Sequence, residues 1–130
     1  MKKLISLLLA FVGALSMMAA QPTIEFDTKS HDFGTIKEAD GSVSCEFAFT
    51  NTGSEPIVII SANASCGCTR PEYPKKPIAP GKTDKIKVTY NPMGRPGEFN
   101  KTIKVRTNAQ GKKSISLKIN GVVIPNSTKK

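Results

Sequence analysis

The sequence predicts an all-β fold: a single immunoglobulin-like antiparallel β-sandwich of about seven strands, placed after an N-terminal signal peptide. Apolar and polar residues alternate with a period of two in four separate segments, which is typical of strands with one buried face. Clusters of Gly, Pro and Asn separate these segments at short intervals. After the leader, no segment of ten or more residues has an apolar stripe at helical spacing. A small barrel is the alternative architecture.

Residues 1–20 have the pattern of a secretory signal peptide. Lys2 and Lys3 precede a largely apolar run over residues 4–18, and Ala19 and Ala20 follow it. The run is shorter than the about 20 apolar residues that a membrane helix needs, so we expect cleavage near Ala20 and no membrane span in the mature chain. An uncleaved anchor is the alternative. No cysteine lies near the end of the run, so the lipoprotein pattern is missing, and we expect a periplasmic or secreted protein.

The mature chain is expected to form one domain over residues 21–124, followed by a flexible tail over residues 125–130. Removal of Lys2 and Lys3 lowers the net charge from +9 to +7. A basic exported domain could meet anionic glycans, lipid headgroups or acidic proteins, and we expect no nucleic acid. The sequence has no phosphate-loop, zinc-protease or serine-hydrolase motif and only one histidine, His31, which we interpret as an ordinary strand-edge residue. We therefore expect no enzyme activity.

Strands are expected where the alternation is strict, in residues 43–50, 85–90, 102–107 and 114–119. Their predicted inward residues are Val43, Cys45, Phe47, Phe49, Ile86, Val88, Tyr90, Ile103, Val105, Ile115, Leu117 and Ile119. Residues 56–60 form a continuous apolar run and predict a more fully covered strand. Residues 23–27 and 31–36 predict a first strand that is interrupted near Lys29 and Ser30. Turn signals lie at residues 51–56, 79–82, 91–98 and 108–113.

Four stretches in this order resemble a known family: HDFGTI, FAFTNTGSEPIVI, ASCGCTRPEYPKKPIAPGK and IKVTYNPMGRPGEFNKTIKVRTN. They are similar to a family of small exported bacterial domains of unknown function, frequent in Bacteroidetes, which carries an SCGCT motif. The match runs from about Ile24 to Val123. The family is in turn similar to Hydin-type and major-sperm-protein-like immunoglobulin domains, so the resemblance implies a sandwich. It places the signature cysteines at Cys66 and Cys68 and leaves Cys45 particular to this chain.

The Cys-Gly-Cys stretch is the candidate site. An exported chain meets an oxidising compartment, and an odd number of cysteines leaves at least one without an intrachain partner. Cys45 alternates with core residues, so we expect a buried and inert thiol there. In extended backbone the Cα atoms of Cys66 and Cys68 would lie about 6.5–7 Å apart, whereas a disulfide prefers about 5.5–6 Å, so closure needs a bend at Gly67. We expect the pair to form a local unit on the loop after the third strand, without Cys45.

Three roles for this pair remain open. A disulfide in so small a ring would be strained and relatively easy to reduce, which would suit thiol redox chemistry. Two thiolates from Cys66 and Cys68 could instead hold Cu(I) in a near-linear site, whereas zinc would need two further ligands. Arg70 could lower the pKa of a thiol in either case. The third role is structural, as a disulfide or a turn of packed thiols.

Basic residues occupy outward strand positions at Lys85, Lys87, Lys104, Arg106 and Lys118. We expect them to be divided between the two sheets and to be solvated surface that discourages edge pairing, with a dedicated polyanion site as the alternative. The sequence therefore predicts an exported, non-catalytic immunoglobulin-like module with no cofactor, which serves as a binding or structural protein of the periplasm or cell surface. Its expected partner is a protein or a surface glycan. The alternative is a small thiol-redox or Cu(I)-binding protein.

Overall fold

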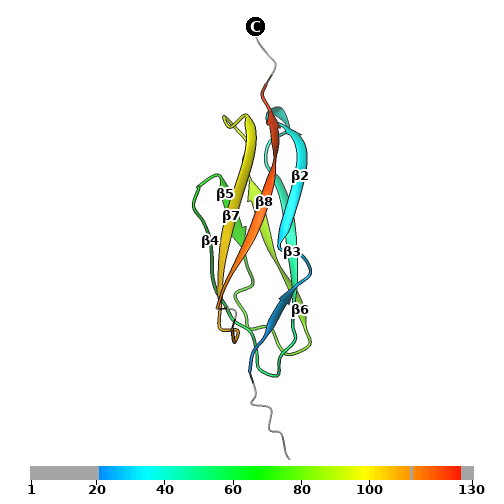
Figure 1. Ribbon diagram of the computed structural model, residues 1–130, viewed down its shortest axis with the longest axis vertical. Coiled ribbons are helices and arrows are strands. Elements are labelled where there is room, and N and C mark those ends of the chain that lie inside the picture. Colours follow the sequence, from blue (N-terminus) through cyan, green and yellow to red (C-terminus); the bar gives the residue numbers. More distant parts are fainter. Residues whose placement is uncertain (1–20, 112, 127–130) are drawn as a thin grey trace, which may run out of the picture.

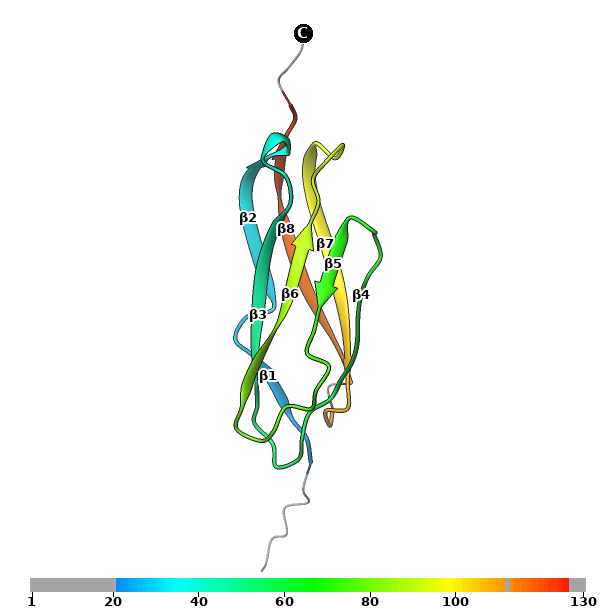
Figure 2. The ribbon, with the colours of Figure 1, turned by 180° about the vertical axis from the view of Figure 1, so that it is seen from behind.

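The computed structural model describes residues 21–111 and 113–126, which form two facing four-stranded sheets. The elements are β1 (Ile24–Phe26), β2 (Ser30–Lys37), the 3-10 helix η1 (Glu38–Asp40), β3 (Val43–Asn51), β4 (Ile59–Ala64), β5 (Thr69–Glu72), β6 (Thr83–Tyr90), β7 (Gly97–Thr107) and β8 (Ser114–Ile124). Sheet A has the order β1-β3-β6-β5, and sheet B has the order β2-β8-β7-β4. Sheet B faces the viewer in Figure 1 and sheet A in Figure 2. The predicted all-β sandwich is confirmed.

The predicted signal peptide at residues 1–20 lies outside the described residues, as do residues 127–130 of the predicted tail. Within the part of the chain that the structure describes, no helix has the length and apolar character of a membrane span.

The strand pairs are antiparallel except for β2 and β8, which run parallel. The predicted interruption of the first strand explains this pair. β1 lies beside β3 in sheet A, the chain then crosses over at residues 27–29, and β2 joins β8 in sheet B. The crossover is fixed where Lys118 N donates to Lys29 O at 2.9 Å. His31 lies on β2 at the edge of sheet B, half-buried, as expected for a strand-edge residue.

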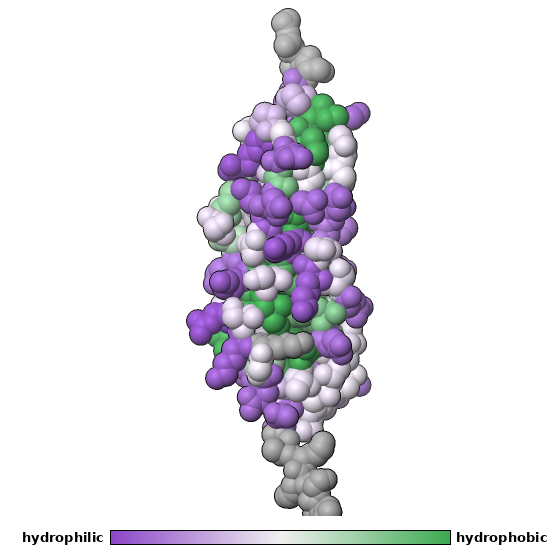
Figure 3. Space-filling view, in the orientation of Figure 1, coloured by the Kyte–Doolittle hydropathy of each residue, from purple (hydrophilic) through white to green (hydrophobic). Residues whose placement is uncertain are grey.

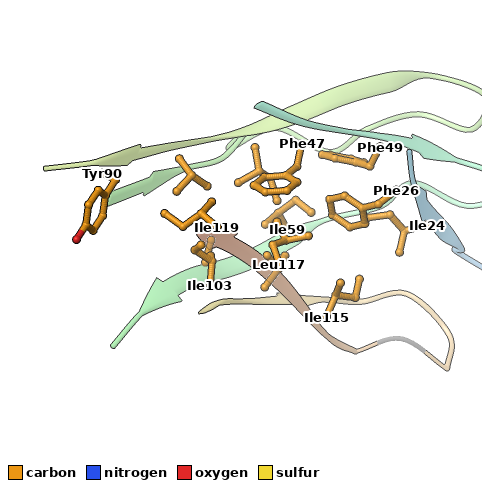
Figure 4. Packing of buried hydrophobic residues seen from close by; sticks show 14 of the residues in the cluster. Ile24, Phe26, Phe47, Phe49, Ile59, Tyr90, Ile103, Ile115, Leu117 and Ile119 are labelled. Carbon is orange, nitrogen blue, oxygen red and sulfur yellow. The ribbon is translucent and has the colours of Figure 1, made fainter. Parts of the chain in front are cut away.

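The core lies between the sheets and is built from the predicted alternating residues. The inward residues of β6, β7 and β8 are buried, as are Phe47 and Phe49 of β3. Figure 4 shows these side chains filling the space between the sheets, with Tyr90 at one end and Ile24 and Phe26 at the other. The prediction was wrong in degree for Cys45, which packs against the core but is only half-buried. Val43, the other predicted inward residue at the start of β3, is likewise only half-buried and packs against the core.

The prediction for residues 56–60 was wrong, because this segment is not covered on both faces. Ile57 and Ile59 are buried, whereas Val58 and Ile60 are 39% and 52% exposed. The segment leads into β4 of sheet B, and every strand of a two-sheet sandwich has the core on one face and solvent on the other. The apolar run therefore alternates between core and surface despite its composition.

The outward basic residues are divided between the sheets as predicted. Lys85 and Lys87 lie on the exposed face of β6 in sheet A, and Lys85 forms an ion pair of 3.6 Å with Glu46. Lys104, Arg106 and Lys118 are exposed on β7 and β8 in sheet B.

Candidate functional site

The Cys66–Cys68 turn joins the edge strand of sheet B to the edge strand of sheet A, at the rim of the sandwich (Figure 2). It follows β4 and precedes β5. Thr69 N donates to Cys66 O at 3.1 Å, and Asn91 N donates to Cys68 O at 2.8 Å, so the turn is fixed by backbone hydrogen bonds at both cysteines. The bend brings the two Cα atoms to 5.1 Å, and the two Sγ atoms form a disulfide.

The two sulfur atoms have different surroundings. Cys68 is 4% exposed and belongs to the core cluster, and its Sγ lies 3.5 Å from the hydroxyl oxygen of Thr69. Cys66 is half-buried, and its Sγ accepts a hydrogen bond of 3.0 Å from Cys68 N. Gly67 between them is exposed. Cys66 is therefore the sulfur that an outside molecule can reach more easily.

A small polar hollow of about 100 Å³ adjoins the buried cysteine. Its lining consists of Ser42, Gly67, Cys68, Arg70, Thr89 and Asn91. Arg70 supplies the positive charge of this lining. The hollow thus places a cation and several hydrogen-bonding groups on the side of Cys68.

Metal binding by Cys66 and Cys68 stays a prediction. The two sulfurs are bonded to each other here, so neither can act as a thiolate ligand until the disulfide is reduced. Among the described residues, no group of three His, Cys, Asp or Glu side chains lies close enough together to hold a metal. A copper site would therefore depend on these two sulfurs in the reduced chain.

Cys45 is a free cysteine that lies apart from this turn. It is paired with Val88 of β6, and β6 separates β3 from β5 in sheet A. Burial and the neighbouring Glu46 carboxylate raise the pKa of the Cys45 thiol from 9.0 to about 11. The thiol is therefore protonated and weakly nucleophilic at neutral pH.

A larger hollow of about 490 Å³ lies on sheet B, over β2, β8 and β7, on the side shown in Figure 3. Its lining consists of Asp32, Gly34, Thr35, Glu98, Phe99, Asn100, Asn120, Gly121 and Val122. The strand register orders these residues in two rows. One row is Asp32, Asn120 and Asn100, and the next is Thr35, Val122 and Glu98. The hollow therefore presents carboxylates and amides in fixed positions on a sheet.

A β-bulge shapes one side of this hollow. Two residues of β2, Phe33 and Gly34, face the single residue Gly121 of β8, because the register shifts between Asp32 and Thr35. Asp32 Oδ1 accepts a hydrogen bond of 2.8 Å from Gly34 N, and Gly34 has a φ of 70°, which favours glycine.

The charge of the hollow is opposite to that of the chain. Its lining contains two carboxylates, Asp32 and Glu98, and no Lys, Arg or His, whereas the full chain has a net charge of +9. Sequence reasoning missed this site because its members come from three strands whose register cannot be read from the sequence. One sequence feature could have indicated the site: Asn100 and Asn120 fall at outward positions when the alternation of the two last strands is extended.

The family model described as "Protein of unknown function (DUF1573)" matches residues 24–123. No curated protein matches the chain. Among solved structures, the chain is similar to a Porphyromonas gingivalis protein of unknown function, with 16% identity and a TM-score of 0.69, over 82% of this chain and 50% of that one. The chain thus spans about half the length of that protein.

Two further structures have the same fold. PapD-like domain 7 of human CEP192 has 11% identity and a TM-score of 0.63, over 94% of this chain and 99% of that one. The periplasmic chaperone SfaE has 13% identity and a TM-score of 0.51, over 80% of this chain and 58% of that one. At such low identity these similarities establish the fold alone, which is the predicted immunoglobulin-like sandwich.

Proposed function

The chain belongs to the DUF1573 family of proteins of unknown function, and from this premise we propose that it is an exported, non-catalytic module that binds a protein partner through the large hollow on sheet B. The main observation behind this proposal is that the hollow contains two carboxylates and two side-chain amides although the chain as a whole is basic. The predicted signal peptide supports export. One structural relative is a periplasmic chaperone, and chaperones bind other proteins, which supports a protein as the partner.

The chemistry of the hollow suits a peptide segment with a basic side chain. The carboxylates of Asp32 and Glu98 can accept hydrogen bonds from a Lys or Arg side chain, while the amides of Asn100 and Asn120 can both donate to and accept from peptide groups. Glu98 is exposed and forms no ion pair within the described residues, so its carboxylate is available.

Two features beside the carboxylates add to this argument. The volume of about 490 Å³ lies within the range of about 300–1,000 Å³ that is usual for ligand sites. Val122 and Ile124 are exposed on the same face of β8 and offer apolar contact beside the polar rows. Figure 3 shows this face as mainly hydrophilic with hydrophobic patches.

The lining supports a binding role over a catalytic one. In the described part of the chain, the hollow has no His, Cys, Ser or Lys in its lining, so the Ser–His and Cys–His pairs of nucleophilic catalysis are not present there. A neutral glycan is the competing ligand. An exposed aromatic platform, on which sugars often stack, is absent from this lining, because Phe99 is buried and its ring stacks on Tyr90 inside the core.

A nuclear magnetic resonance titration of the isotope-labelled chain tests the proposal. The probes are an arginine-containing peptide, a glutamate-containing peptide of equal length and a neutral oligosaccharide. We expect the arginine peptide to shift the side-chain amide signals of Asn100 and Asn120, and we expect Glu98→Lys to abolish these shifts. Glu25→Lys, at an exposed position of β1 in sheet A, is the matched control and should retain them.

Two outcomes would overturn the proposal. Equal shifts with the acidic and basic peptides would show that the carboxylates do not select the ligand. Shifts of the hollow residues with the oligosaccharide alone would assign the site to a glycan.

A further inference from the structure

We propose that Cys66–Cys68 is an exchangeable disulfide, which oxidises a cysteine thiol of a partner protein, with Cys66 as the attacked sulfur and Cys68 as the leaving group. This activity is independent of the binding proposed for the hollow on sheet B. It rests on the different surroundings of the two sulfurs and on the way the turn is held.

Access selects Cys66 as the attacked atom. Cys66 is half-buried, whereas Cys68 is 4% exposed within the core cluster. The neighbouring Gly67 is exposed, and a Cβ added there would meet no atom within 4 Å, so the space beside the disulfide is open. A partner's thiolate can therefore approach the turn from outside, and it meets the sulfur of Cys66 first.

Electrostatics select Cys68 as the leaving group. The hydroxyl of Thr69 lies 3.5 Å from Cys68 Sγ and can donate a hydrogen bond to a thiolate there. Arg70 lines the same small hollow as Cys68 and adds a positive charge. Both effects lower the pKa of a thiol and oppose the increase that the burial of Cys68 causes, and a thiol of lower pKa leaves faster in thiol–disulfide exchange.

The exchange takes place in two steps, in which bonds, electrons and protons balance. The partner's thiolate attacks Cys66 Sγ, a mixed disulfide forms, the bond between Cys66 and Cys68 breaks, and Cys68 leaves as a thiolate that is protonated from solvent. A second thiolate of the partner then attacks the mixed disulfide at the partner's own sulfur, and Cys66 leaves as a thiolate. The sum is one disulfide formed in the partner, one reduced in this chain, and two electrons and two protons transferred.

The turn can lose its disulfide without losing its shape. The backbone hydrogen bonds at Cys66 O and Cys68 O remain after reduction, as does the pairing of β5 with β6. Cys68 N also remains as a donor to Cys66 Sγ. Both sulfurs thus keep a donor in the reduced state, and stabilisation of the reduced state makes a disulfide a better oxidant.

A purely structural role is weaker on these grounds. The stabilisation of a folded chain by a disulfide grows with the length of the loop that it closes, and this disulfide spans two positions in the sequence. It therefore adds little constraint to a turn that is already fixed by its backbone.

The first experiment locates the attacked sulfur. A Cys45→Ala variant removes the third cysteine, and the oxidised protein is mixed with a limiting amount of a cysteine-containing peptide and quenched with acid. Peptide mapping by mass spectrometry should find the mixed disulfide at Cys66 at least about tenfold more often than at Cys68, because a reactive cysteine must be accessible. Equal labelling, or labelling mainly at Cys68, would overturn the assignment.

The second experiment tests whether exchange occurs under biological conditions. The same variant is equilibrated with mixtures of reduced and oxidised glutathione, and folding is monitored by circular dichroism. We expect the disulfide to be reduced within the range of these mixtures while the strand signal persists. A disulfide that stays oxidised in reduced glutathione alone would overturn the proposal and leave a structural role.

A third measurement tests whether the charge of Arg70 lowers the pKa of the Cys68 thiol. In a reduced chain with Cys66→Ser and Cys45→Ala, Arg70→Gln should raise the apparent pKa of Cys68, which is followed by the ultraviolet absorbance of its thiolate. In the oxidised Cys45→Ala chain, which keeps both cysteines of the turn, the same substitution should slow exchange about threefold, the size expected for an exposed charge. Arg106→Gln, an exposed arginine of sheet B, is the matched control and should change neither quantity. An equal effect of the two substitutions would contradict the role of Arg70.

Discussion

The rings of Tyr90 and Phe99 are stacked, with their centroids 4.0 Å apart and their planes at 10°. Tyr90 comes from β6 of sheet A and Phe99 from β7 of sheet B, so the contact joins the two sheets at one end of the core. Phe99 is paired with Gly121 of β8, and a Cβ on Gly121 would lie 2.9 Å from Cε1 and from Cζ of the Phe99 ring. The ring therefore occupies the space that a side chain at Gly121 would need.

Gly121→Ala should destabilise the fold by about 1–3 kcal/mol, because extra volume in a packed core forces side chains and backbone to move. The new methyl group would also lie 2.8 Å from Gly34 O, a backbone atom of the bulge. Urea unfolding followed by circular dichroism measures the change. Gly67→Ala is the control, since its Cβ would meet nothing within 4 Å. Equal loss of stability in both variants would contradict the packing argument.

Local pattern was enough to predict most of the sandwich. The inward residues of β6, β7 and β8 follow from alternation alone, since one face of each strand is covered and the other is solvated. The same reasoning failed at residues 56–60, where composition indicated coverage on both sides. Whether both faces of a strand are covered depends on the number of layers in the fold, which no local pattern contains.

The two candidate sites also differ in how far the sequence alone predicts them. Cys66 and Cys68 are neighbours in sequence, so their local unit could be proposed from spacing and from Gly67. Which sulfur is buried depends on the core beneath β5, and this was not predictable. The hollow on sheet B was missed because Asp32, Asn100 and Asn120 become neighbours only through the parallel register of β2 and the antiparallel register of β7 on β8.

Asn51 is a fully buried polar residue whose side chain ties two loops to the end of β3. Its Nδ2 donates to Glu55 O and to Ile78 O, each at 2.8 Å, and its Oδ1 accepts from Gly53 N at 2.9 Å. Asn51→Leu should destabilise the fold by about 3 kcal/mol or more, since each buried group left without a partner costs about 1–3 kcal/mol. Chemical denaturation gives the value.

Asn108→Leu is the matched control for this prediction. Asn108 also accepts from a backbone N–H, that of Val58, and donates to a backbone carbonyl, that of Pro56. Its side chain is exposed, so water can replace the lost bonds, and we expect a smaller loss of stability. A loss as large as that of Asn51→Leu would show that burial does not decide the cost.

Glu38 joins η1 to two distant segments. Its Oε2 accepts from Gly94 N at 2.6 Å, and its Oε1 accepts from Asn126 N at 3.1 Å. Glu38→Ala removes both acceptors, so the amides of Gly94 and Asn126 should exchange with deuterium faster by at least about tenfold, because loss of hydrogen bonds to a charged acceptor costs about 1.5–3 kcal/mol. Asp40→Asn, at an exposed position of η1, should leave both exchange rates unchanged. Unaltered protection in Glu38→Ala would contradict the assigned role.

Cys45 is the free thiol of the oxidised chain, so its titration can be followed by alkylation without interference from Cys66 and Cys68. Burial contributes most to its raised pKa, and the Glu46 carboxylate contributes next. Because its pKa rises from 9.0 to about 11, its thiolate fraction well below pH 9 should be about 100-fold lower than that of an ordinary thiol.

The alkylation rate of Cys45 by iodoacetamide should therefore be slow at neutral pH and rise toward a midpoint near pH 11. Glu46→Gln should lower this midpoint, because it removes the carboxylate that opposes the thiolate, whereas Glu25→Gln on β1 should not. The raised pKa also affects folding: the native state holds the proton more tightly than the unfolded chain, so this contribution to stability is present below pH 9 and is lost as the pH rises from 9.0 to about 11. Unfolding of Cys45→Ser in parallel isolates this contribution from that of the lysines. A midpoint at the ordinary thiol value, unchanged by Glu46→Gln, would show that neither burial nor Glu46 controls this thiol.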